Sequence, residues 1–159
     1  MEQTIFHHMD TVRGITEKSI KSIPEEKSDI IPEGFNNSIR WNFSHIAFVQ
    51  EKLVFGISGE DMNVPLNYER LFGAGTKPAD WTETPPSFDE ISSVLSEQKP
   101  RIQTFLHGRL HQKLPRPFTN RGGITFHTTG EAFLFGFYHE AMHMETIKRI
   151  YRSISSMLD

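Results

Sequence analysis

The sequence predicts an all-α protein: a four-helix bundle of the up-down type, with a long loop between the second and third helices. Four segments place apolar residues at steps of three and four, the spacing of one helical face. Two of these segments begin with a Ser/Thr-x-x-Glu capping box, and none shows the sustained alternation of a half-buried strand. A chain of 159 residues is close to the size of one ordinary domain, so we expect a single domain over residues 1–159.

The first helix is expected from about residue 5 to residue 23, where apolar side chains recur on one face. These residues are Ile5, Met9, Val12, Ile20 and Ile23. Pro24 opens a polar connection that reaches Phe35. Residues 36–38 then supply side-chain oxygens that can cap a second helix, which we expect to continue to Gly56.

A long excursion is expected between residues 56 and 86, because glycine and proline are dense there. These residues are Gly56, Gly59, Pro65, Gly73, Gly75, Pro78, Pro85 and Pro86. Within the excursion we expect one short helical turn at residues 66–72. A connection of this length usually implies function or variability.

The third helix begins at the capping box of Ser87 and Glu90. Its apolar stripe runs on to Leu110, and Pro100 is expected to kink it.

A loop rich in proline, arginine and glycine follows at residues 114–125. A strand-like candidate at residues 123–126 is too isolated to build a sheet. Thr128 and Glu131 repeat the capping box, and the fourth helix is expected from there to about Ser156.

Composition excludes several function classes. The chain has no cysteine, which removes disulfides, thiolate metal sites and cysteine nucleophiles, and leaves His, Asp and Glu as the strong metal ligands. The net charge is −3 and no Lys/Arg-rich run is present, so we expect no nucleic-acid partner. No stretch approaches the apolar length of a membrane span and the first residues do not resemble a signal peptide, so we expect a cytoplasmic protein without membrane contact.

The fourth predicted helix carries the strongest chemical signal. His139 and His143 lie one turn apart on one face, so both imidazoles can bind one metal ion. Apolar and small residues share that face and turn it into the bundle: Ala132, Gly136, Ile147, Ile150 and Ile154. The string also matches the His-Glu-x-x-His motif of metalloproteases, but Thr146 and Arg149 stand where the extended motif requires Gly and His. Glu140 is offset from the ligand face. We expect it either to support the ligands or to lie on the surface.

A third ligand must come from upstream, and His45 is the best placed candidate. It lies within the apolar stripe of the second helix, between Trp41 and Val49. Alone, it would be read as a core histidine bonded to a neighbouring helix. Beside an inward-facing histidine pair, it completes a set of three imidazoles with open coordination positions, which is typical of catalytic metal sites.

The remaining histidines are weaker candidates. His107 and His111 are four residues apart, but they fall in the last predicted turn of the third helix, where a cationic side chain suits the helix dipole. His7 and His8 are adjacent and point about 100° apart, so they cannot share one ion. His127 precedes the fourth helix and is placed either at a pocket mouth or in a solvated loop.

Two sequence blocks resemble the DinB-like superfamily of metal-binding four-helix bundles. The segment 36–46, with Trp41-x-x-x-His45, is similar to the family's second helix, and 129–143 is similar to its fourth. The family includes bacillithiol and mycothiol transferases and metal-dependent hydrolases of the YfiT type. The resemblance implies a metal triad of His45, His139 and His143 that holds nickel, zinc or a similar divalent ion, with Trp41 and Asn42 near the pocket. After His143 the sequence departs from the family pattern.

The resemblance implies three readings of function. The leading one is a metal-dependent transferase acting with a low-molecular-weight thiol on a small-molecule substrate. The second is a metal-dependent small-molecule hydrolase, and the third is a non-catalytic metal-binding stress protein. A cleft that opens onto vacant metal positions would favour an enzyme, whereas a fourth protein ligand would favour a structural site. We also expect a homodimer, because twofold assemblies are the commonest oligomers and this family often pairs its bundles.

Overall fold

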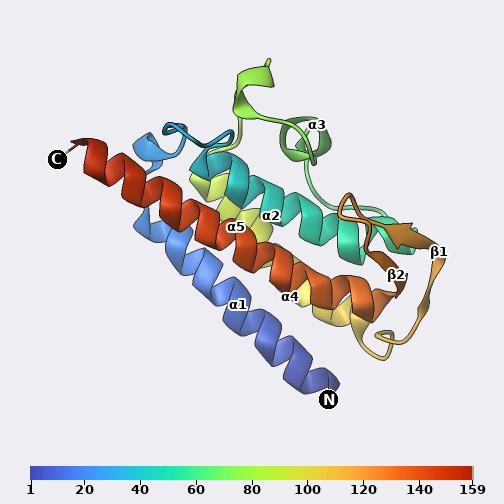
Figure 1. Ribbon diagram of the computed structural model, residues 1–159. Coiled ribbons are helices and arrows are strands. Elements are labelled where there is room, and N and C mark those ends of the chain that lie inside the picture. The colour runs from blue at the N-terminus through green and yellow to red at the C-terminus, as the bar shows by residue number, and fades with distance from the viewer. Residues whose placement is uncertain (159) are drawn as a thin grey trace.

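In the computed structural model, which describes residues 1–158, four long helices form the body of the molecule (Figure 1). They are α1 (Glu2–Ser22), α2 (Ile39–Val54), α4 (Phe88–Leu106) and α5 (Thr129–Leu158). The short helix α3 (Tyr68–Phe72) lies between α2 and α4, together with single 3-10 turns. Two strands, β1 (Lys113–Thr119) and β2 (Thr125–Thr128), join α4 to α5. Among the described helices, none combines the length and apolar character of a membrane span.

The predicted starts of α2, α4 and α5 are confirmed by their caps, whereas α1 begins at Glu2, before the predicted residue 5, and has no side-chain cap. Ser38 accepts a hydrogen bond from the backbone N–H of Trp41 (3.2 Å), and Ser87 and Glu90 form the reciprocal capping box. Thr128 and Glu131 form the second box, with the backbone N–H of Glu131 donating to the Thr128 hydroxyl. These bonds occupy helix-terminal N–H groups that lack a partner within the helix.

Helix α4 ends at Leu106, so the predicted extension to Leu110 is wrong. The backbone leaves helical geometry at His107, and Gly108 follows with a φ of +69°. Glycine adopts this left-handed conformation without steric cost, which makes it a common helix terminator. The helix does pass through Pro100 without interruption.

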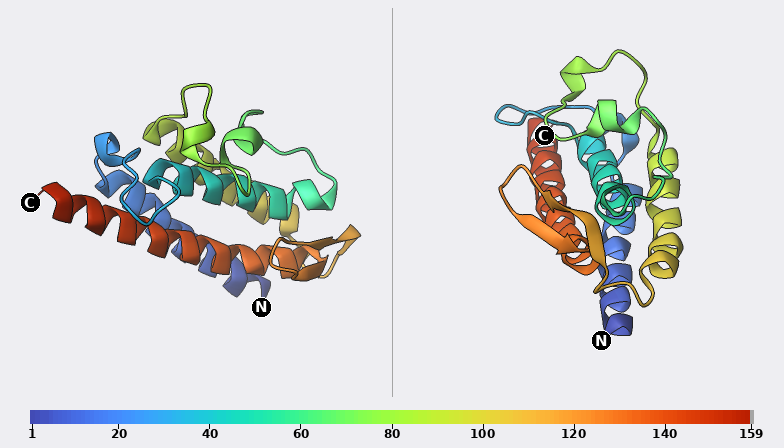
Figure 2. Two further views of the ribbon diagram at one scale, coloured as in Figure 1. Left: turned by 45° about the horizontal axis from the view of Figure 1, so that its top comes forward. Right: turned by 90° about the vertical axis from the view of Figure 1, so that its right-hand side faces the viewer.

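The helices are not arranged as a simple up-down bundle. One hydrophobic cluster contains Ile20, Ile39, Ile91 and Ile150. A second cluster contains Met9, Val54, Ile102 and Phe133. The end of α1 therefore packs beside the starts of α2 and α4 and the end of α5. Helices α1 and α5 run in one direction and α2 and α4 in the other, as the colour gradient also shows (Figures 1 and 2).

The long connection between α2 and α4 makes this arrangement possible. Because α2 and α4 are parallel, the chain must return along the length of α2 before α4 begins. The segment that the sequence identifies as a long loop provides that return, and it carries α3 at residues 68–72, within the predicted turn at 66–72. Helix α2 packs against α4 and α5, and α1 packs against the same two helices from the other side.

The connection between α4 and α5 contains a β-hairpin that sequence patterns did not predict. Residues 114–125 were expected to be a loop and 123–126 too isolated for a sheet, but β1 and β2 pair antiparallel, with Phe118 opposite Phe126. The pairing is irregular around Pro115 and Pro117, which a two-stranded sheet tolerates because each strand has a free edge. The hairpin is held by tertiary packing of its buried residues on α2 and α5.

Candidate metal centre

Three histidines converge between α2 and α5, the two helices with the most extensive mutual contact. His45 comes from α2, and His139 and His143 come from successive turns of α5. One nitrogen from each ring lies within 4.8 Å of the other two, and the ring centroids are 4.5–5.0 Å apart. The structure thus brings together the three residues that the sequence proposed as ligands.

The orientation of His45 is fixed from two sides. Its Nδ1–H donates a hydrogen bond to the backbone carbonyl of Phe72 in α3, at 2.6 Å. The indole of Trp41 stacks on the imidazole, with the ring centroids 4.4 Å apart and the planes 15° from parallel. A carbonyl can only accept a hydrogen bond, so the proton of the neutral ring is on Nδ1 and Nε2 carries a free lone pair.

His143 is oriented in the same way by Asn42. The amide nitrogen of Asn42 donates to the backbone carbonyl of Ser38 at 2.8 Å, which leaves its Oδ1 to face the imidazole. The Nδ1–H of His143 donates to that oxygen at 2.8 Å. The Nε2 of His143 is therefore also an unprotonated ligand atom. Such bonds to the second ring nitrogen typically fix the tautomer and orientation of metal-binding histidines.

The spacing of the nitrogens fits a shared cation. Nε2 of His139 lies 3.2 Å from Nε2 of His45. Two nitrogens each 2.0–2.1 Å from one ion at a tetrahedral angle are about 3.3–3.4 Å apart, so this separation matches one edge of a coordination sphere. Three neutral imidazoles are a donor set that zinc, nickel and similar divalent ions accept. The residues present therefore fit a divalent metal ion.

The surroundings keep the three imidazoles neutral. Burial lowers the pKa of His45 to about 4, despite the opposing effect of its hydrogen bond to Phe72. Burial, together with the charge of neighbouring histidines, lowers the pKa of His139 and of His143 to about 3. Neutral imidazole is the form that binds metal, so the free protein holds its ligands ready at physiological pH.

Glu140, which follows His139, faces the opposite way. Its carboxylate is 3% exposed and pairs with Arg13 of α1 at 3.1 Å. It also accepts a hydrogen bond from the hydroxyl of Thr16. Glu140 therefore neither supports the histidine triad nor lies on the surface, the two places expected for it. The metalloprotease role of a glutamate in this motif is not available to it, because the carboxylate is held in the core on the α1 side.

The other histidines do not join the site. His127 is exposed on β2 and lines neither of the two pockets described below, so the expectation of a solvated residue describes it better than a pocket mouth. His107 and His111 lie beyond the end of α4 rather than in its last turn, and His107 pairs with Glu2 at 3.2 Å. His7 and His8 are exposed on α1.

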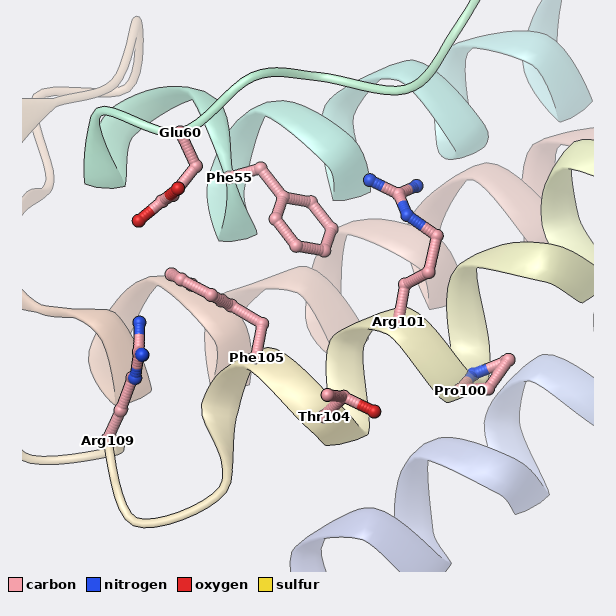
Figure 3. Close-up of a pocket in the computed structure, with 7 residues that line it drawn as sticks. All are labelled: Phe55, Glu60, Pro100, Arg101, Thr104, Phe105 and Arg109. Carbon is pink, nitrogen blue, oxygen red and sulfur yellow. The ribbon is translucent and has the colours of Figure 1, made fainter.

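A pocket of about 350 Å³ opens beside the triad. It is lined by Trp41 and Asn42 of α2, by His143, Thr146 and Arg149 of α5, and by residues 34–37 before α2. A larger pocket of about 560 Å³ lies elsewhere, where Phe55 at the end of α2 faces Phe105 of α4 (Figure 3). None of the three histidines lines the larger pocket, so the smaller one is the candidate substrate site.

Sequence reasoning missed the groups that support the ligands through the backbone. The carbonyls of Phe72 and Ser38 carry no side-chain signal, and Phe72 is 27 positions away from His45. The sequence marks Thr146 and Arg149 only as departures, from the protease motif and, for Thr146, from the family pattern after His143. Steps of three after His143 make each residue a neighbour of the next on the helix surface, with a drift of about 60° per step, and only the structure shows that all three line one pocket.

Comparison with known proteins agrees with this geometry. Residues 8–147 match the DinB superfamily. The chain belongs to the DinB superfamily. No curated protein matches the chain. A crystal structure of a conserved protein from Enterococcus faecalis has a TM-score of 0.68 and covers 98% of each chain at 13% sequence identity. At that identity the likeness shows a shared fold, and the superfamily includes metal-binding proteins.

Proposed function

We propose that this DinB-superfamily protein binds a divalent metal ion through His45, His139 and His143 and uses it to activate a small nucleophile. The observation that carries the proposal is the pair of imidazoles whose Nδ1–H groups are held by Phe72 and Asn42. Both rings thereby present Nε2 lone pairs to the same point. Nickel and zinc are the ions we propose, because both accept imidazole ligands.

The site supports an enzyme better than a structural metal centre. Among the described residues, no fourth His, Asp or Glu joins the triad. A structural site would be closed by four protein ligands, whereas three leave room for another molecule. The pocket beside His143 gives such a molecule access. These features support catalysis over the alternative of a non-catalytic metal-binding stress protein.

The pocket favours a thiol over water as the nucleophile. A divalent ion at the triad would act as a Lewis acid and lower the pKa of a thiol or of water. Water activation by hydrolases commonly needs a general base as well, but no carboxylate lines this pocket and Glu140 is engaged by Arg13. A thiol ionises near pH 8.5 without help, so a modest lowering of its pKa is sufficient. We therefore propose a thiol S-transferase of the bacillithiol type, with a metal-dependent hydrolase as the alternative.

The chain's own residues would orient the reacting groups. Trp41 shields one face of His45, and Asn42 holds His143 against rotation. The wall of the pocket beyond them offers the amides of Asn36 and Asn37 and the hydroxyl of Thr146 for binding a polar substrate.

The test is metal analysis of protein purified without an affinity tag or added metal, followed by a thiol-conjugation screen. We expect bound nickel or zinc at one ion per chain, and conjugation that is lost on metal removal and restored by the ion. A matched control is His111→Ala, which changes an exposed histidine outside the site. Conjugation that continues unchanged in metal-free protein would overturn the proposal, and metal-dependent hydrolysis without conjugation would favour the alternative.

We also propose a homodimer. Ile150 and Ile154 are buried in the core of the single chain, so they are not available to a partner. Large apolar side chains that are exposed on α5 are Leu134, Tyr138, Met142 and Met157. Light scattering at micromolar concentration is expected to give twice the mass of one chain, and a monomeric mass would refute the dimer.

A further inference from the structure

Arg149 marks the outer part of the pocket beside the triad. Its guanidinium lies over the ring of Phe35, 5.6 Å from the ring centroid. In the described part of the chain, no carboxylate lies within ion-pair distance of Arg149. Arg149 is exposed, whereas the two buried arginines, Arg13 and Arg40, are both paired with acidic side chains. The donors of Arg149 are therefore unpaired within the described chain and accessible to a molecule in the pocket that this residue lines.

The pocket has a positive charge balance, although the whole chain carries a net charge of −3. Arg149 is its one charged lining residue, and no Asp or Glu lines it. A guanidinium presents a planar fork of donors that matches a carboxylate or phosphate. Asn37 also lines the pocket, and its side-chain oxygen is buried without a hydrogen-bond partner.

Arg149 lies two helical steps along α5 from the metal ligand His143. His143, Thr146 and Arg149 follow one another at steps of three along α5 and line the same pocket. Six residues of helix correspond to about 9 Å along the axis between the backbone positions of His143 and Arg149, which is the scale of a small molecule. A ligand that fills the pocket can place one end at His143 and the other at Arg149.

Resting on the proposed function, we infer that the substrate or thiol is an anionic compound whose carboxylate or phosphate is bound by Arg149. Phe35 supports the guanidinium from one side and limits its freedom. The reactive group then lies at the triad end of the pocket. Arg149 acts as a specificity residue: it selects anionic molecules and takes no part in the bond-forming step.

The first test compares two thiols on cobalt-loaded protein, with the visible absorption of cobalt as the binding signal. The probes are 6-mercaptohexanoate and its neutral counterpart 6-mercaptohexan-1-ol, both long enough to span the pocket. We expect the carboxylate to bind about tenfold more tightly than the alcohol, the effect of one charge-assisted hydrogen-bonding pair that is partly solvated. Arg149→Gln is expected to abolish the preference, and Arg149→Lys to retain part of it. The preference should also weaken as salt is raised.

Arg152→Gln is the matched control, because Arg152 is exposed on the same helix and does not line the pocket. It is expected to keep the wild-type preference. An equal loss in Arg152→Gln and Arg149→Gln, or equal affinity of the two thiols in the wild type, would overturn the inference while leaving the proposed function in place.

A second measurement separates the two hypotheses. Hexanoate is titrated into metal-free protein, and the Arg149 side-chain N–H signal is followed by nuclear magnetic resonance, with hexan-1-ol as the neutral control. We expect a shift with hexanoate alone. If hexanoate shifts the signal but neither thiol changes the cobalt spectrum, the anion site stands and the proposed function fails. If hexanoate produces no shift, the inference is overturned, whatever the cobalt experiment shows.

Discussion

His139 and Glu140 are neighbours in the sequence, but they belong to two different polar networks on opposite sides of α5. Toward α2, His45 is held by Phe72 and His143 by Asn42, while Nε2 of His139 lies against Nε2 of His45, and the three ligand nitrogens remain close together. Toward α1, the buried carboxylate of Glu140 forms an ion pair with Arg13 and accepts a hydrogen bond from Thr16. The first network has capacity left for a ligand, whereas the second has its charges matched internally. In this His-Glu-x-x-His segment, the histidines are thus available to bind a ligand, whereas the glutamate stabilises the fold.

The largest loss of stability is expected when the ion pair between Glu140 and Arg13 of α1 is removed. Glu140→Ala leaves the guanidinium of Arg13 buried without its counter-charge, which typically costs about 3–5 kcal/mol. Urea denaturation is expected to show this loss, whereas Glu145→Ala, an exposed change on the same helix, should stay within about 0.5 kcal/mol. If Glu140→Ala instead leaves stability intact and removes metal binding, the division between the two networks is wrong.

A smaller effect is expected on the α2 side. His143→Ala should abolish tight metal binding but leave the helical fold intact, because the metal-free core does not depend on it. The stabilisation lost in the presence of metal is RT ln(1 + [L]/Kd), about 2.7 kcal/mol when free metal is a hundredfold above Kd. Thermal melting with and without metal, together with calorimetry, measures both quantities.

For His143→Ala, the metal-free variant should melt close to the metal-free wild type. The cavity left by alanine and the removal of a buried polar group act in opposite directions. An unfolded metal-free variant would mean that His143 has a structural role as well.

The support of the ligands is tested by Asn42→Ala. This change removes the acceptor that holds the Nδ1–H of His143, without removing a ligand. Loss of such a supporting bond typically weakens metal affinity 10- to 100-fold, about 1.4–2.7 kcal/mol. Ser44→Ala is a matched control on the same helix, because the Ser44 hydroxyl has no hydrogen-bond partner in the described structure. Equal affinities for the two variants would contradict the role given to Asn42.

The stability of the metal-free protein is expected to depend on pH through the three histidines that face α2. The folded-state pKa values of His45, His139 and His143 lie at about 4, 3 and 3, below the ordinary value of 6.5. Below pH 6.5 the unfolded chain therefore binds protons that the folded protein excludes, so stability falls as the pH is lowered from about 6.5 toward 4.

Each of these histidines contributes a slope of at most about 1.4 kcal/mol per pH unit, and less for the two that are partly exposed. His143→Ala should make the decline shallower, and His111→Ala should not. Denaturation curves between pH 7 and pH 4.5 measure the slopes. Identical slopes in the wild type and His143→Ala would show that burial does not hold this imidazole neutral.

Much of the fold was determined by local sequence signals. Helical spacing and the caps at Ser38, Ser87 and Thr128 predicted the four long helices, and the density of glycine and proline predicted the long connection. The inward-facing pair on α5, together with His45 in the α2 stripe, led to the triad that the structure brings together. These predictions succeeded because capping bonds and the 3.6-residue period involve residues only a few positions apart.

What only the tertiary structure decided depends on residues far apart in the chain. The parallel course of α2 and α4, the β1–β2 hairpin and the place of Glu140 between Arg13 and Thr16 all follow from packing between distant segments. The hairpin contains two prolines and lacks a clean alternating pattern, so its strands are set by the surface on which they pack rather than by their own propensity. The sequence alone determined which residues form helices and which histidines face inward. Tertiary packing decided how the helices run and which buried groups remain available to a ligand, because both depend on contacts that no local pattern encodes.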